Sequence, residues 1–145
     1  MVSSPSFSNI DAGTPASILC VIMRILIADD HAAVRQGLRE ILADALPGAQ
    51  FAEASSGDEV LPNLAISECN LLLLDIHMPG RDGLDVLRDV KRAYPQLPVI
   101  MVSVQPKDQY AMRCLQAGAA AYINKDSVAE ELAPAARKIL AVEAD

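Results

Sequence analysis

Four leucines and an aspartate, Leu71-Leu72-Leu73-Leu74-Asp75, are followed by the turn-forming stretch Ile76-His77-Met78-Pro79-Gly80. An uninterrupted apolar run of this kind predicts a strand buried on both faces, which is typical of parallel sheets covered by helices. In such sheets, ligand sites lie just beyond the carboxyl ends of the strands. Asp75 stands at this place, where it either carries chemistry or only caps the turn that follows.

Composition limits the class of protein. The chain has 145 residues, 52% hydrophobic and 21% charged, which is enough for one globular domain with a full core. Its net charge of −7 disfavours direct binding to nucleic acid, because attraction to phosphates supplies most non-specific affinity. No apolar run is long enough to span a bilayer. Cys20, Cys69 and Cys114 lack the paired spacing of a zinc site, so we expect reduced, buried thiols in a cytoplasmic protein.

The N-terminal residues differ in composition from the rest of the chain. Residues 1–16 are rich in Ser, Pro and Asn, which predicts a flexible segment, and the apolar stretch 18–22 lacks the basic residues that precede a signal sequence. We therefore predict an N-terminal extension over 1–22, one domain over 23–142, and a C-terminal end or linker over 143–145.

Strand and helix patterns alternate five times along the domain. Apolar, β-branched runs predict strands over 24–30, 49–55, 70–75, 99–103 and 119–124. Apolar residues at helical spacing predict helices over 31–46, 57–66, 82–94, 107–117 and 127–142. The last of these helices has Ser127 as predicted N-cap, Glu130 in a capping box, and Pro134 as a point of weakness. This order predicts an α/β fold with a doubly wound parallel sheet and right-handed crossovers.

Polar side chains gather at the predicted strand ends: Asp29, Asp30, Asp75, Ser103 and Lys125. Because the carboxyl ends of parallel strands share one edge, we expect these groups to lie together. Three carboxylates there require a cation, and hard oxygen ligands favour Mg²⁺. The lysine and the hydroxyl suit phosphoryl oxygens, and the first strand is not followed by a glycine-rich phosphate loop. The pattern therefore indicates a site that places a phosphoryl group on a carboxylate.

With these motifs the chain resembles the receiver domain of two-component response regulators over about residues 23–140. The matching segments are Ile27-Ala28-Asp29-Asp30-His31, Leu73-Leu74-Asp75-Ile76-His77-Met78-Pro79-Gly80-Arg81-Asp82-Gly83, Val102-Ser103, and Gly118-Ala119-Ala120-Ala121-Tyr122-Ile123-Asn124-Lys125-Asp126. The first and last segments look most like the NarL/FixJ-type transcriptional regulators. The resemblance implies a flavodoxin-like (βα)5 sheet with strand order 2-1-3-4-5.

The resemblance also implies roles for the strand-end residues. Asp75 would be the phosphoacceptor for a sensor histidine kinase or a phosphotransfer protein. Asp30, Asp75 and the backbone carbonyl of His77 would bind Mg²⁺, or Mn²⁺, with Asp29 acting through water. Lys125 would pair with the phosphoryl group.

A switch is implied as well. Ser103 would move toward the phosphoryl group, and Tyr122 would turn inward as it moves. His77 and Gln105 stand where the family tunes the phosphoryl lifetime, and Val104 is bulkier than usual and is expected to narrow access to the site. His31 is expected to be a surface residue rather than a metal ligand.

Several alternatives stay open. The chain is either a piece of a transcriptional regulator, whose C-terminal helix-turn-helix domain lies outside it, or a stand-alone or degenerate receiver that acts as a protein-interaction module. A haloacid dehalogenase-type phosphatase would need a second aspartate where His77 stands, and a nucleotide- or flavin-binding module would need a phosphate loop.

We expect a cytoplasmic signalling domain rather than an enzyme, one that catalyses only its own phosphorylation and dephosphorylation. Its expected partners are a kinase and, on activation, a second copy of itself. Neither a membrane nor direct DNA contact is expected. Arg35 and Arg39 lie off the apolar stripe of the first helix, where they either meet a kinase or are merely solvated.

Overall fold

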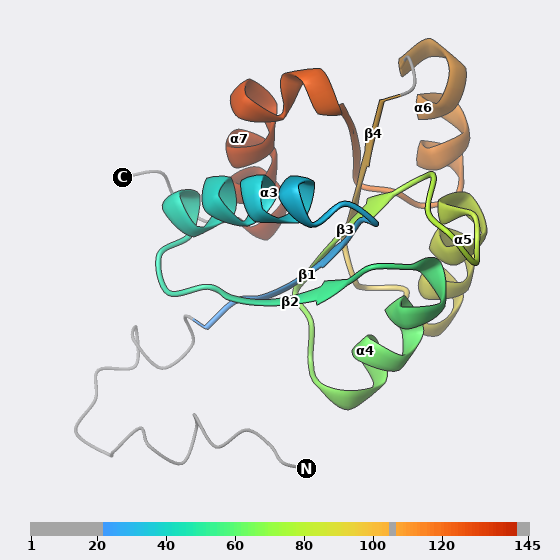
Figure 1. Cartoon of the computed structure of the whole chain (residues 1–145), viewed down its shortest axis with the longest axis horizontal. Helices are drawn as coiled ribbons and strands as arrows, with labels where there is room; N and C mark the ends of the chain where they lie inside the picture. The colour runs from blue at the N-terminus through green and yellow to red at the C-terminus, as the bar shows by residue number, and fades with distance from the viewer. Residues whose placement is uncertain (1–21, 105–106, 142–145) are drawn as a thin grey trace.

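The computed structural model describes residues 22–104 and 107–141. Its five strands form one parallel sheet in the order β2-β1-β3-β4-β5, which confirms the predicted topology (Figure 1). The strands are β1 (Arg24–Ala28), β2 (Gln50–Ala54), β3 (Leu71–Asp75), β4 (Val99–Ser103) and β5 (Ala121–Asn124).

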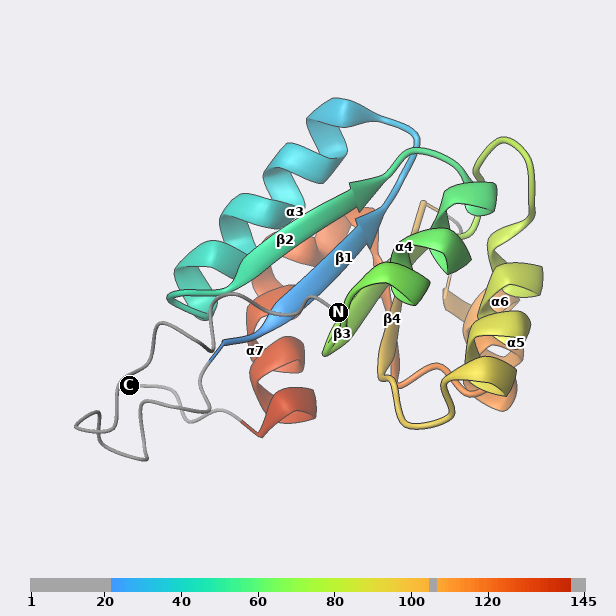
Figure 2. The same ribbon diagram turned by 90° about the horizontal axis from the view of Figure 1, so that it is seen from below.

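Helices cover both faces of this sheet. Helices α3 (Ala32–Ala45) and α7 (Val128–Leu140) pack on one face. Helices α4 (Val60–Ile66), α5 (Gly83–Ala93) and α6 (Lys107–Gln116) pack on the other. The view in Figure 2 shows the sheet between these two layers. None of the helices in the described part of the chain is long and apolar enough to cross a membrane.

The leucine run of β3 explains why the fold is a three-layer sandwich. Leu72 and Leu74 pack toward α4, α5 and α6, whereas Leu71 and Leu73 pack toward α3 and α7. Each of the four side chains is at most 1% exposed. A strand with helices on both faces needs apolar residues at every position, so the run is continuous rather than alternating.

Some element ends differ from the sequence-based expectation. β1 stops at Ala28, so Asp29 and Asp30 belong to the loop after it. The segment predicted as one helix over 57–66 begins with the 3₁₀ turn η1 (Gly57–Glu59) before α4.

The predicted capping box at Ser127 is wrong. The Ser127 side chain makes no capping hydrogen bond. Instead, the side chain of Asn124 accepts a hydrogen bond from the backbone N–H of Asp126, which starts the 3₁₀ turn η2 (Lys125–Ser127) ahead of α7. Asn124 can cap this turn because it ends β5 in an extended conformation. Helix α7 then continues through Pro134.

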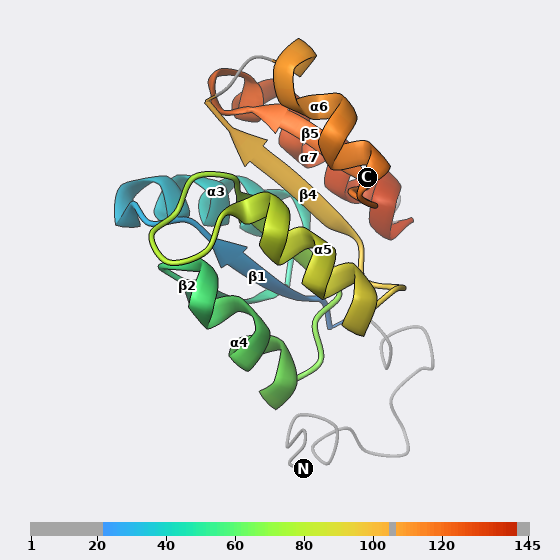
Figure 3. The same ribbon diagram turned by 90° about the vertical axis from the view of Figure 1, so that its right-hand side faces the viewer.

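The strand register brings the loops after β1 and β3 together. Ala28 pairs with Leu74, so the residues that follow them, Asp29 and Asp75, lie at the same edge of the sheet. Strand order reverses between β1 and β3, which is where ligand sites form in doubly wound sheets. Figure 3 shows the arrowheads of β1 and β4 directed to this common edge.

Candidate functional site

Three of the predicted strand-end residues are buried. Among the described residues, the buried polar or charged side chains are Asp29, Asp75 and Ser103, which are 1%, 4% and 0% exposed. Lys125 lies against both carboxylates. Its Nζ atom is 2.7 Å from Oδ2 of Asp29 and 3.5 Å from Oδ2 of Asp75. The fold thus gathers an ammonium and two carboxylates that are up to 96 positions apart in the sequence.

Burial changes the proton affinity of this group. It raises the pKa of Asp75 to about 6, with a further increase from the charge on Asp29 and an opposing effect of Lys125. Burial by itself would lower the pKa of Lys125, but the hydrogen bond to Asp29 and the charges of both aspartates outweigh it and raise that pKa. Lys125 therefore stays protonated at neutral pH, and Asp75 is mostly ionised there.

Asp29 is held at each of its polar groups. Its backbone N–H donates to the carbonyl of Ala54 at 3.0 Å, and its own carbonyl accepts from Nη1 of Arg35 at 2.6 Å. Its Oδ1 atom accepts from the backbone N–H of His31 at 2.8 Å, and Oδ2 faces Lys125. These contacts turn the Asp29 side chain inward and leave Asp30, which is 27% exposed, as the more accessible carboxylate.

The residues after β1 fit a divalent cation. Asp29, Asp30 and His31 offer ligand atoms that all lie within 4.8 Å of one another. The Oδ1 atom of Asp30 is buried without a hydrogen bond among the described residues, and it lies 3.1 Å from Nδ1 of His31. An unbonded carboxylate oxygen beside other hard oxygen donors is suited to Mg²⁺. His31 is 68% exposed, as expected of a surface residue, yet it lies at this cluster.

The predicted lifetime-tuning residues lie at different places. The backbone N–H of His77 donates to Oδ1 of Asp75 at 3.4 Å, while its side chain is exposed and meets Tyr110 edge-to-face with ring centroids 6.1 Å apart. Val104 is 65% exposed, so most of its side chain is in solvent rather than packed over the site. Gln105 lies outside the described residues.

Ser103 and Tyr122 already contact each other in this structure. Tyr122 is 6% exposed and its hydroxyl takes part in a hydrogen bond with Ser103. Burial raises the pKa of this phenol, partly offset by that hydrogen bond. The inward position expected for Tyr122 on activation is the position that its ring has in this structure.

Comparison with known proteins identifies the family. Residues 25–137 match the family described as response regulator receiver domain. The chain belongs to this family. The receiver domain is 37% identical over 121 residues to the response regulator GacA of Pseudomonas viridiflava, covering 83% of this chain and 56% of GacA. It is 31% identical over 118 residues to the response regulator UvrY of Escherichia coli K12, covering 81% and 54%. Both are regulators of the NarL/FixJ type, as the motifs predicted.

A solved structure agrees with the fold. The receiver domain protein (CheY-like) from Methanospirillum hungatei JF-1 superposes with a TM-score of 0.75 at 29% identity, covering 83% of this chain and 94% of that one. The chain spans a little over half the length of the GacA and UvrY relatives. The shared part is thus the receiver domain.

Sequence reasoning missed the role of Arg35. It was expected at an exposed position on the first helix, but its side chain is only 15% exposed. The guanidinium bonds to the Asp29 carbonyl and, through Nε, to Oε1 of Glu53 at 2.6 Å. Its spacing of six residues after Asp29 was the available signal, but the partner Glu53 becomes its neighbour only through the pairing of β1 with β2.

Sequence reasoning also did not predict that position 83 requires glycine. The backbone N–H of Gly83 donates to the carbonyl of Ile76 at 2.7 Å. A Cβ atom at this position would collide with the carbonyl oxygen of Asp75 and lie 2.6 Å from Cα of Ile76. Only glycine allows α5 to begin this close to the loop that carries Asp75.

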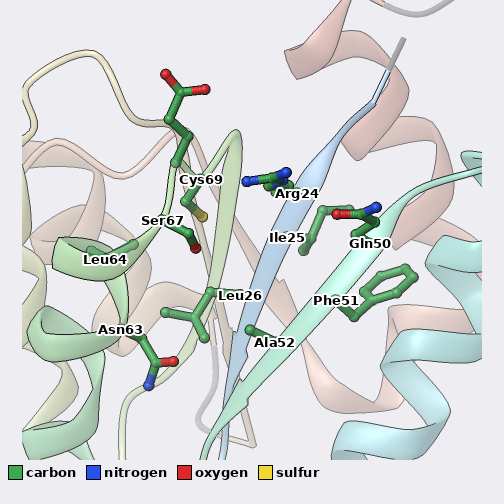
Figure 4. A pocket seen from close by; sticks show the side chains of 11 residues that line it. Arg24, Ile25, Leu26, Gln50, Phe51, Ala52, Asn63, Leu64, Ser67 and Cys69 are labelled. Atoms are coloured by element: carbon green, nitrogen blue, oxygen red, sulfur yellow. The ribbon is translucent and has the colours of Figure 1, made fainter. Parts of the chain in front are cut away.

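A separate cavity lies at the opposite end of the strands. It has a volume of about 160 Å³ between α4 and the first residues of β1 and β2, and its lining includes Arg24, Phe51 and Cys69 (Figure 4). Cys69 donates to the carbonyl of Leu71 at 3.1 Å, and burial raises the pKa of its thiol. A thiol that stays protonated is a poor nucleophile, so Cys69 is not activated for nucleophilic chemistry in this cavity.

Proposed function

We propose that this receiver domain accepts a phosphoryl group on Asp75 from a phosphohistidine of a sensor histidine kinase or phosphotransfer protein, acting in the cytoplasm. The observation that carries the proposal is the ammonium of Lys125, held between buried Asp29 and Asp75 at the carboxyl edge of the sheet. A carboxylate oxygen of Asp75 attacks phosphorus, a P–O bond forms as the P–N bond breaks, and the imidazole leaves and takes up a proton.

The other residues stabilise charge during transfer. Lys125 is positioned to pair with an equatorial phosphoryl oxygen without moving far from Asp29. Ser103 is buried at the end of β4, where it pairs with Asn124, and it can donate a hydrogen bond once its contact with Tyr122 is released. Mg²⁺ or Mn²⁺, held by Asp30, Asp75 and the His77 carbonyl with Asp29 through water, would neutralise the phosphoryl oxygens.

The proton affinity of Asp75 suits a nucleophile. With a pKa of about 6, the carboxyl group is mostly ionised at neutral pH, and it is more basic than an ordinary aspartate. In the metal-free site most of the Asp75 carboxyl group is thus already deprotonated at neutral pH, as attack on phosphorus requires.

For the output, we propose transcriptional control through a C-terminal helix-turn-helix domain outside this chain, with homodimerisation on activation. Support comes from the relatives: GacA and UvrY are response regulators of which the chain matches a little over half. A stand-alone or degenerate receiver that works as an interaction module is the alternative. The phosphatase alternative loses support because His77, not an aspartate, stands two residues after Asp75 and the chain matches the receiver family.

Intact mass after incubation with acetyl phosphate and Mg²⁺ tests the proposal. Wild-type protein is expected to gain one phosphoryl group, while Asp75→Asn and wild type with a chelator are expected to gain none. Asp85→Asn on the exposed surface of α5 is the matched control and is expected to behave as wild type.

A wild-type protein without adduct would prompt the same assay with a phosphorylated kinase domain as the donor. Absence of the adduct in both assays would contradict the proposal and favour the degenerate receiver. An adduct that persists in Asp75→Asn would move the acceptor to another residue.

A further inference from the structure

We propose that Arg35 is a positioning residue for cation binding: it fixes the peptide that joins Asp29 to Asp30, and thereby the direction of the Asp30 carboxylate. The inference rests on the proposed function only in that the cation is the one that serves phosphoryl transfer. It adds a residue on α3 to a site otherwise built from strand ends.

Arg35 bridges two parts of the sheet edge. Its Nη1 atom donates to the carbonyl oxygen of Asp29, and its Nε atom donates to Glu53 on β2, both at 2.6 Å. Two bonds from one planar guanidinium define the place of both acceptors, because the donor directions are rigid. Figure 2 shows α3 running beside β2, which makes this bridge possible.

The carbonyl of Asp29 belongs to the same peptide plane as the N–H of Asp30. Asp29 is also held by its N–H on Ala54 and by its Oδ1 on the His31 N–H. With Arg35 on the carbonyl, this peptide cannot rotate without breaking a charge-assisted hydrogen bond. The Oδ1 atom of Asp30 lies 3.1 Å from Nδ1 of His31, the next residue along the same backbone, so the direction of this carboxylate follows the backbone that Asp29 and Arg35 hold.

Glu53 offsets the positive charge that the Arg35 guanidinium places near the metal site. A free guanidinium beside the aspartates would repel Mg²⁺. Glu53 pairs with Arg35 at 2.6 Å and, at the longer distance of 3.2 Å, with Arg39. The hydrogen bond from Arg35 lowers the pKa of Glu53, so Glu53 is ionised and offsets one of the two positive charges. Arg35 can therefore hold the backbone with less repulsion toward the metal than an unpaired arginine would cause.

Arg39 provides a matched control. It also pairs with Glu53, at 3.2 Å, and its guanidinium lies 5.4 Å from the centre of the Phe51 ring. It carries the same charge and shares the same acidic partner as Arg35, and it contacts Glu53 and Phe51 on β2 rather than Asp29. Replacing either arginine with glutamine thus removes one positive charge beside Glu53, and Arg35→Gln also removes the bond to Asp29.

The experiment is calorimetric titration of the full chain with Mg²⁺ alone, for wild type, Arg35→Gln and Arg39→Gln. Arg35→Gln is expected to weaken Mg²⁺ binding by about tenfold, the scale of a lost hydrogen bond from a charged group, and Arg39→Gln by less than about twofold. Hydrogen exchange of the His31 amide, without metal, is expected to speed up only in Arg35→Gln. If Arg35 only stabilised the fold, the exchange rate of the His31 amide and the Mg²⁺ affinity would be the same in the two variants.

Equal Mg²⁺ affinities for the two variants would overturn the inference, whatever the phosphorylation assay gives. If wild type itself neither binds Mg²⁺ nor takes a phosphoryl group, the proposed function fails instead. Should Arg35→Gln not fold, Arg35→Lys and Arg39→Lys replace the pair. A lysine at 35 cannot bridge both acceptors, so the same order of affinities is expected, and its absence overturns the inference.

Discussion

The Nζ atom of Lys125 lies 2.7 Å from Oδ2 of Asp29, closer than its 3.5 Å distance from Oδ2 of Asp75. The lysine is thus bound mainly to a carboxylate other than Asp75, the proposed phosphoacceptor. Burial raises the pKa of Asp75 to about 6, and the ammonium of Lys125, at 3.5 Å, offsets this only in part. Asp29 holds the lysine in place, which leaves Asp75 available for its proposed role as nucleophile.

This relationship predicts the effect of removing the Asp29 charge. Asp29→Asn takes away a repulsive neighbour and frees Lys125 to approach Asp75. The pKa of Asp75 is therefore expected to fall from about 6 toward its ordinary value of 3.8. Carboxyl-carbon NMR titration without metal measures it. Asp126→Asn, on the exposed residue next to Lys125, is the control, and an unchanged Asp75 pKa in Asp29→Asn would contradict the assignment.

Asp75→Asn is expected to stabilise the fold in the absence of metal. The folded-state pKa lies above the ordinary value, so the native state binds the proton more tightly and wild-type stability falls as pH rises from about 4 to about 6. Above about pH 7 the neutral amide should raise the free energy of unfolding by about 1–3 kcal/mol. Urea unfolding with a chelator measures this difference, and a less stable variant would be the opposite of the expected result. Asp85→Asn should show no such pH dependence.

Gly83→Ala is expected to destabilise the domain by about 2–3 kcal/mol, because the new methyl group meets the Asp75 carbonyl. Gly37→Ala in α3 is the matched control. A Cβ there meets no atom within 4 Å, and alanine is a better helix former, so that variant should gain about 0.5–1 kcal/mol. Urea unfolding compares both, and equal stabilities would show that the loop after β3 tolerates a displacement.

Tyr122→Phe removes the hydrogen bond with Ser103 but keeps the buried ring. The expected loss is about 1 kcal/mol of unfolding free energy, with the phosphoryl adduct still formed. Tyr94→Phe, at the C-terminal end of α5, controls for loss of a hydroxyl. If instead Tyr122→Phe prevented the adduct, the hydroxyl would act in phosphoryl transfer itself rather than in the state that follows.

His77 and Gln105 are expected to set the phosphoryl lifetime. The backbone N–H of His77 donates to Asp75, and its exposed ring packs edge-to-face on Tyr110, from where we expect it to limit the approach of water to Asp75. His77→Ala is expected to hydrolyse the phosphoryl group faster, on the order of threefold, or about 0.7 kcal/mol in the barrier. Loss of the adduct with time, followed by intact mass after donor removal, gives the rate. Unchanged rates in both His77→Ala and Gln105→Ala would refute the prediction.

Local pattern was sufficient for the fold of this protein. The leucine run of β3 requires two covering layers, and the five alternations of strand and helix then leave few topologies. Because parallel strands end at one edge, the same pattern also placed Asp29, Asp75, Ser103 and Lys125 near one another. These inferences depend on the order of elements along the chain, which the sequence contains directly.

Other features depend on contacts between residues that are distant in the sequence, and these only the folded chain reveals. The bond of Arg35 to Asp29 and Glu53, the preference of Lys125 for Asp29, and the inward position of Tyr122 each follow from strand register and side-chain packing. The apolar stripe of the first helix places Arg35 outside the core, but it does not say that the edge of β2 lies beside it. Helical periodicity describes one element at a time, whereas the ion pairs and hydrogen bonds at this site form between several elements that pack together.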